Sequence, residues 1–89
     1  MLIQKLDNRF RGHEFFEFAI VFRVEEIPQF VTAREWCWET MGPSTELENH
    51  WVNTNHDWAW ECNVSTVRPT ARIYLKSNKE LVYFNLKWL

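Results

Sequence analysis

Four residues whose side chains can bind a metal lie close together in the middle of the chain: His50, His56, Asp57 and Cys62. Zinc sites use closely spaced ligand pairs such as Cys-x-x-Cys or His-x-x-x-His, and no such pair occurs here. The spacing therefore argues against a structural metal. We expect neither a metal nor a cofactor.

The two cysteines, Cys37 and Cys62, are the candidate nucleophiles. Both fall on faces that are predicted to be buried, where a thiol behaves as a small hydrophobic group. Nothing in the chain indicates export to an oxidising compartment, so a disulfide is not expected. The sequence predicts two reduced, buried thiols.

General acid–base chemistry would need a carboxylate beside an exposed nucleophile in a pocket. The glutamates instead point outward along the predicted helix and strands. Because the chain has only two glycines, it also lacks a glycine-rich loop that could cradle a phosphate. The sequence predicts that the protein is not an enzyme.

Alternating apolar residues predict a strand from Glu14 to Val24, around which we expect the chain to be built. Because successive side chains of a strand point to opposite faces, one face is strongly apolar. That face carries Phe16, Phe18, Ile20, Phe22 and Val24. The opposite face is half apolar, which favours a central strand. Residues 1–12 are either a short edge strand or an arm.

A helix is predicted to include Ala33 to Met41 and to end at Gly42. Pro28 to Val31 form either its first turn or a separate tight turn, because Thr32 and Glu35 have the spacing of a capping box. The stripe that faces the sheet consists of Phe30, Ala33, Cys37 and Met41, with Trp38 beside it.

Three further alternating segments predict strands: Asp57 to Val64, Ala71 to Lys76 and Leu81 to Trp88, with a tight turn at residues 77–79. A long loop, from Pro43 to His56, precedes them. The predicted fold is a single α+β domain of residues 1–89 with the order β-α-β-β-β. Its sheet is mainly antiparallel, and one helix packs on one face.

The charge distribution indicates the kind of partner. Residues 25–62 contain eight acidic residues against Arg34 alone, although the whole chain carries a net charge of only −2. Such an array steers association toward a basic surface. We therefore expect a non-enzymatic protein-binding module that uses the acidic helix face and the long loop. The predicted partner-binding residues are Glu35, Trp36, Glu39, Glu46, Glu48 and Trp51. Trp36 is either boundary packing or the interface anchor.

The alternative is a single-stranded nucleic-acid-binding protein. Aromatic and basic side chains that share a sheet face can stack bases and contact phosphates. The last two predicted strands carry such a set: Arg72, Tyr74, Lys76, Tyr83 and Lys87. The acidic middle of the chain opposes this function.

Residues 72–76 followed by residues 81–88 resemble the terminal hairpin of small uncharacterised accessory proteins of tailed bacteriophages. The resemblance covers about a fifth of the chain and carries over no site residue. It implies a viral accessory or inhibitor protein that binds a host protein.

No apolar run approaches the roughly 18 residues that a membrane-spanning helix needs, and no charged start followed by an apolar run and a cleavage site is seen, so we do not expect secretion. We expect a cytoplasmic protein, in the host cytoplasm if it is viral, without membrane association. A homodimer is expected through the predicted edge strand at residues 81–88.

Overall fold

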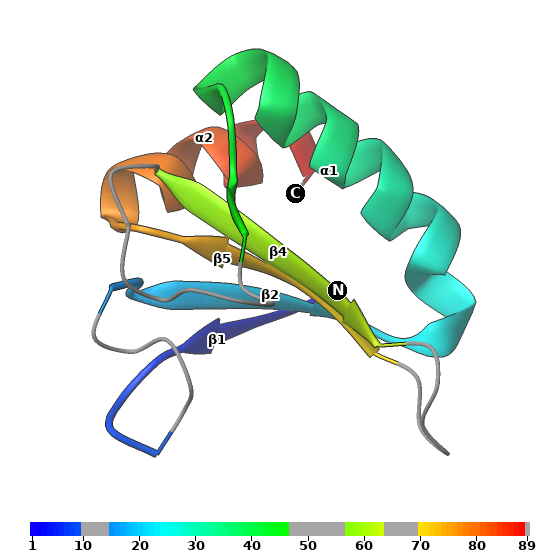
Figure 1. The fold of residues 1–89 in the computed structure, drawn as a ribbon, viewed down its shortest axis with the longest axis horizontal. Helices are drawn as coiled ribbons and strands as arrows, with labels where there is room; N and C mark the ends of the chain where they lie inside the picture. The colour runs from blue at the N-terminus through cyan, green and yellow to red at the C-terminus, as the bar shows by residue number, and fades with distance from the viewer. Residues whose placement is uncertain (10–14, 47–56, 64–69, 89) are drawn as a thin grey trace.

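The computed structural model describes residues 1–9, 15–46, 57–63 and 70–88 of the chain. In these residues five strands form one sheet, and two helices cover one of its faces (Figure 1). The strands lie in the order β1-β2-β5-β4-β3, and every neighbouring pair is antiparallel except β3 and β4. The predicted α+β class with a mainly antiparallel sheet is confirmed.

The first two strands form one edge of the sheet. β1 (Leu2–Lys5) is the edge strand, and β2 (Phe18–Phe22) lies between β1 and β5. The interior position predicted for β2 is confirmed, but the strand is shorter than the alternation suggested. Phe16 is buried on the face of the sheet opposite to Ile20 and Phe22. Val24 is exposed in the 3-10 helix η1 (Val24–Glu26).

The main helix, α1 (Ile27–Met41), begins earlier than the sequence required. Pro28 to Val31 form its first turn, so the question left open by the sequence is resolved. The capping box predicted at Thr32 is wrong, because Thr32 lies inside the helix and its hydroxyl donates to the Pro28 carbonyl at 3.2 Å. Gly42 ends the helix at a φ of 82° and donates its amide to the Trp38 carbonyl.

The remaining strands are β3 (Thr45–Glu46), β4 (Trp58–Asn63) and β5 (Thr70–Leu75). β4 and β5 match their predictions and are antiparallel. β3 lies in the segment predicted to be a loop and runs parallel to β4. The rest of that predicted loop, residues 47–56, lies outside the described residues.

The last predicted strand is wrong, because residues 78–88 form a second helix, α2 (Asn78–Trp88). Its start carries the Ser-x-x-Glu spacing, and the Ser77 hydroxyl donates to the Glu80 carboxylate at 2.6 Å. Phe84 is buried, and Leu81 and Trp88 pack beside the same core, which is helical spacing. The predicted homodimer contact through an edge strand at 81–88 therefore loses its structural basis.

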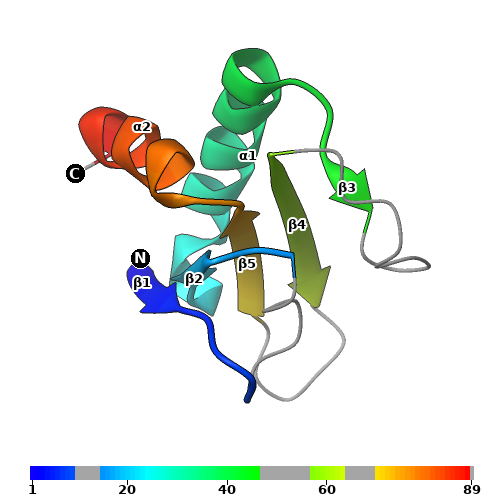
Figure 2. The same ribbon diagram turned by 90° about the vertical axis from the view of Figure 1, so that its left-hand side faces the viewer.

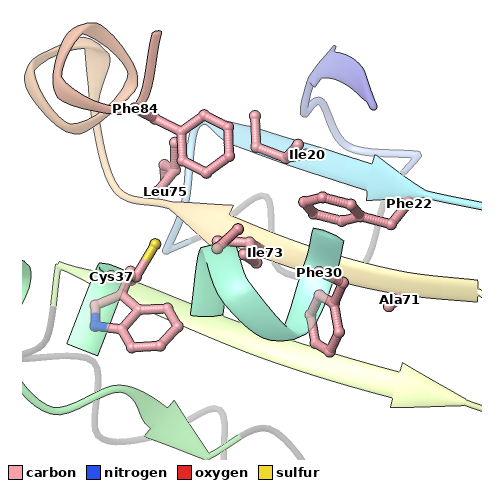
Figure 3. Packing of buried hydrophobic residues seen from close by; sticks show 10 residues of the cluster. Ile20, Phe22, Phe30, Cys37, Ala71, Ile73, Leu75 and Phe84 are labelled. Carbon is pink, nitrogen blue, oxygen red and sulfur yellow. The ribbon is translucent and has the colours of Figure 1, made fainter. Parts of the chain in front are cut away.

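Both helices pack on the same apolar cluster. Side chains of β2, β4 and β5 meet those of α1 and α2 there (Figure 3). Its fully buried members are Ile20, Phe22, Phe30, Ala33, Cys37, Trp58, Ala71, Ile73, Leu75 and Phe84. The predicted inward stripe of α1 is confirmed, with Met41 half-buried at its end. A smaller cluster lies on the other face of the sheet and contains Leu6, Phe16, Ala19, Ala59 and Tyr74.

The two helices divide the covered face between them. α2 lies toward the β1–β2 side of the sheet, whereas α1 crosses its middle, and β3 is at the far edge (Figure 2). The two flanks of α1 therefore differ. One faces α2, and the other faces the side of β4 and β3.

Candidate functional site

The outward surface of α1 carries the acidic residues that the sequence singled out. Glu35 and Glu39 are both exposed, four residues apart on one side of the helix. Their placement on an open acidic surface matches the prediction. They are the two predicted partner-binding side chains that the structure brings together on this surface.

Trp36 lies on the flank of α1 that faces α2. Its ring meets Phe84 edge-on at 5.9 Å and Trp88 edge-on at 6.4 Å between ring centroids. It is half-buried and packs against the apolar cluster. Of the two interpretations of Trp36, boundary packing is the one that this geometry favours, because these contacts already occupy its ring.

Trp38 is the aromatic residue that stands on the open surface. Its side chain is 54% exposed, yet its ring meets the buried ring of Trp58 edge-on, with centroids 6.4 Å apart and planes at 90°. Trp58 is itself fixed, since its indole N–H donates to the Gly42 carbonyl at 2.8 Å. Trp38 is therefore an exposed aromatic side chain that is held by a rigid support.

The residues around Trp38 form one continuous surface. Val31, Glu35 and Trp38 recur at steps of four and three, so they lie along the same side of α1, and Glu39 adjoins Trp38. Val31 is also exposed. We call this surface, made of Val31, Glu35, Trp38 and Glu39, the Trp38 face.

Trp38 and Val31 were not predicted to be surface residues. The available signal was their position seven residues apart, which places them on one helical stripe away from Phe30, Ala33 and Cys37. Because Trp38 is hydrophobic, it was predicted to lie beside the inward stripe. Its exposure depends on how Trp38 packs against Trp58 of β4. The spacing of residues within the helix does not show this contact.

Three predicted partner-binding residues lie outside α1: Glu46, Glu48 and Trp51. The backbone of Glu46 belongs to β3, in register with Trp60 of β4. Glu48 and Trp51 lie outside the described residues. The described part of the predicted site is thus the surface of α1.

The predicted nucleic-acid-binding set does not form one face. Tyr74 is only 3% exposed, with its ring 5.9 Å from that of Phe16, so it offers no open surface for a base. Arg72 and Tyr74 both donate to the Glu61 carboxylate, at 3.2 and 3.0 Å. A carboxylate in this position partly neutralises the guanidinium that was expected to meet phosphate.

The second half of that set lies elsewhere. Tyr83 and Lys87 belong to α2, which packs on the opposite face of the sheet from Tyr74. Lys76, which directly follows β5, is exposed near the predicted position. The expected aromatic and basic sheet face is therefore wrong, since it depended on residues 81–88 being a strand.

A pocket of about 440 Å³ opens beside β1 and η1, and its lining residues are Met1, Leu2, Val21, Arg23, Glu25 and Glu26. Hydrogen bonds to Glu26 from the amino group of Met1 and from the Arg23 amide lower the pKa of this carboxyl. None of these described lining residues is a Ser, Thr, Cys or His. The described lining therefore offers no nucleophile paired with a base.

The two thiols are both free, but their environments differ. Burial raises the pKa of Cys37 from its ordinary value of 9.0 to about 12, which keeps this thiol neutral. Cys62 is half-buried, next to the last residue of β4, so its predicted burial is only partly met. The Cys37 thiol is therefore not an activated nucleophile.

Among the described residues, no three His, Cys, Asp or Glu side chains lie close enough together to hold a metal ion. His50 and His56 belong to the part of the chain outside that description. Neither described helix is both long and apolar enough to cross a membrane. Comparisons of this chain with protein-family models, with curated proteins and with solved structures found no match.

Proposed function

We propose that this protein is a non-enzymatic protein-binding module and that the Trp38 face is its contact surface. The observation that carries the proposal is Trp38, which is 54% exposed and still held edge-on against Trp58. Tryptophan is enriched among the residues that dominate binding energy at interfaces. A side chain that is already ordered loses less conformational freedom on binding, so the support from Trp58 favours an anchor role.

The chemistry of the partner follows from the residues around the anchor. Glu35 and Glu39 flank Trp38 with negative charge, and Val31 adds apolar area. The complementary surface is an apolar patch with a basic border. In such a contact the carboxylates mainly raise the association rate, whereas the buried tryptophan mainly slows dissociation.

The proposal includes a context taken from the sequence. The resemblance to phage accessory proteins supports a host protein as the partner and an inhibitory role. That resemblance was to a terminal hairpin, whereas residues 70–88 form a strand followed by a helix. The proposed binding surface does not depend on it.

The test is a comparative capture experiment with the immobilised protein and three variants. Trp38→Ala removes the anchor, Glu35→Lys/Glu39→Lys reverses the flanking charge, and Glu17→Lys/Glu25→Lys is a control with the same change in net charge. Glu17 and Glu25 are exposed and lie outside α1. Circular dichroism checks that each variant is folded.

We expect a protein that the native chain and the control retain equally and that both α1 variants lose by about tenfold or more, which corresponds to about 1.4 kcal/mol. Retention should also fall as salt is added, because the charges are exposed. If every captured protein is held equally by all four chains, the Trp38 face is not the binding surface.

A further inference from the structure

The outward side of α2 is an apolar surface with a basic border. Val82 and Tyr83 are 46% and 47% exposed, and Leu86 is 80% exposed. Their spacing of one, three and four residues places them on one side of the helix. Lys79 and Lys87 are exposed on the same side, and the Lys87 ammonium lies 5.6 Å from the centroid of the Trp88 ring. We call Lys79, Val82, Tyr83, Leu86 and Lys87 the α2 outer face.

The charges of this face and of the Trp38 face are opposite. The acidic residue of α2, Glu80, is buried and accepts from Ser77, so it does not reduce the positive charge of the α2 outer face. The cation of α1, Arg34, is half-buried at the border of the Trp38 face, one helical turn before Trp38, and its guanidinium lies 4.6 Å from the centroid of Trp60. Glu35 and Glu39 are both fully on the exposed side, so the Trp38 face is net acidic, whereas the α2 outer face is basic.

The two faces also point away from each other within one molecule. Trp36 contacts α2, and Trp38 follows two residues later, about 200° further around the helix axis. Trp38 accordingly contacts Trp58 of β4. Figure 2 shows β4 and α2 on opposite sides of α1. One molecule cannot close its α2 outer face on its own Trp38 face, but it can present both faces to other copies.

We propose that the α2 outer face binds the Trp38 face of a second copy of this chain, head to tail. This inference rests on the proposed function and names the partner of the same surface. Val82 and Leu86 pack around the partner copy's tryptophan, while the two lysines approach the two glutamates. Pairing of two α2 outer faces is disfavoured, because it brings lysines together.

The geometry of this contact sets how the assembly grows. A contact between two different faces leaves one of each free, so copies add in series unless the rotation closes a ring. One helix face against another is a small interface, below the range of stable complexes of about 1,200 Å² or more. The association is therefore weak, reversible and dependent on protein concentration.

Charge reversal with complementation tests the proposal. Glu35→Lys/Glu39→Lys makes both faces of one chain basic, and Lys79→Glu/Lys87→Glu makes both faces acidic. Either variant alone should associate about tenfold or more weakly than the native chain, because its two faces now repel. An equimolar mixture of the two variants, and the chain that carries all four substitutions, should regain association.

The readout is sedimentation velocity with light scattering on the purified chains, from about 10 µM to about 1 mM, the concentration range in which a weak, reversible contact is populated. Glu17→Lys/Glu25→Lys again controls for net charge. Leu86→Ser tests the apolar part, and it should weaken association without affecting the fold, since Leu86 is 80% exposed.

Two results would overturn the inference. One is a native chain that stays monomeric over the whole concentration range, and the other is association that is equally strong in the native chain and in both charge-reversal variants. In either case, capture of another protein that depends on Trp38 would leave the proposed function standing. Conversely, the two variants can complement each other while no other protein is captured through Trp38. That result would confirm the self-association and exclude a different protein as the partner of the Trp38 face.

Discussion

The indole ring of Trp38 meets that of Trp58 edge to face, at 90° and with 6.4 Å between centroids, although one ring is largely exposed and the other is completely buried. Trp58 belongs to the core and holds the end of α1 through its hydrogen bond to Gly42. The pair therefore connects a structural residue with a candidate binding residue. Substitutions can separate the two roles.

Trp38→Ala should cost about 1–2 kcal/mol of the free energy of unfolding, because it removes one aromatic pair and a side chain that is 54% exposed. Trp58→Ala should cost about 3–5 kcal/mol, since it creates a cavity and removes the donor to the Gly42 carbonyl. Chemical denaturation monitored by circular dichroism measures both values. Equal costs would show that Trp38 is a core residue and would count against the Trp38 face.

The two thiols should differ in accessibility. Cys37 is fully buried and should react with Ellman's reagent only after denaturation, whereas the half-buried Cys62 should react measurably in the native protein. Cys37→Ala and Cys62→Ala assign each phase of the reaction. A fast phase that survives in Cys62→Ala would contradict the packing of α1 on the sheet.

The raised pKa of Cys37 predicts a loss of stability at alkaline pH. The unfolded thiol ionises above pH 9.0, but the folded thiol stays neutral to about pH 12 because of burial. Protons are therefore released on unfolding within this window, so the stabilisation is complete below pH 9.0 and is lost toward pH 12. Between these two pH values, the contribution of the Cys37 thiol to the free energy of unfolding falls by about 1.4 kcal/mol per pH unit.

The measurement for this pH effect compares the native chain with Cys37→Ala, because tyrosine and lysine titrate in the same range in both. Their difference in the free energy of unfolding should be constant at neutral pH and should narrow from pH 9.0 upward. A constant difference through pH 10.5 would show that the thiol is not buried as described.

The start of α2 should depend on Ser77. Ser77→Ala removes the donor to the buried Glu80 carboxylate and should cost about 1–2 kcal/mol. Lys79→Ala, an exposed change in the same turn, should be close to neutral. Denaturant titrations compare the two. Equal effects would mean that the Ser77 contact does not stabilise the helix.

Local sequence patterns were enough to predict α1 and three of the strands. Gly42 ends α1 by supplying a positive φ, and Phe30, Ala33 and Cys37 fall on the predicted inward stripe. Alternation located β2, β4 and β5, because one side of each strand is packed under the helices. The acidic surface of α1 was predictable for the same reason, since Glu35 and Glu39 lie opposite the stripe.

Residues 81–88 show where local pattern was insufficient. Val82, Phe84, Leu86 and Trp88 alternate like a strand, yet Leu81, Phe84 and Trp88 also have helical spacing, so two periods fit the same segment. The sheet decides between them. β5 already has β2 on one side and β4 on the other, so a strand that follows it has no free edge beside it. A helix instead satisfies its own backbone hydrogen bonds.

The sequence by itself determined the α+β class, the main helix and the acidic side of that helix, since these depend on spacing within one segment. The tertiary structure alone decided that Trp36 packs under α2, that Trp38 stays exposed on Trp58 and that Tyr74 is buried. These outcomes depend on which element lies beside each residue. Contacts between segments far apart in the chain leave no periodic pattern within either segment, which is why only the assembled sheet and helices reveal them.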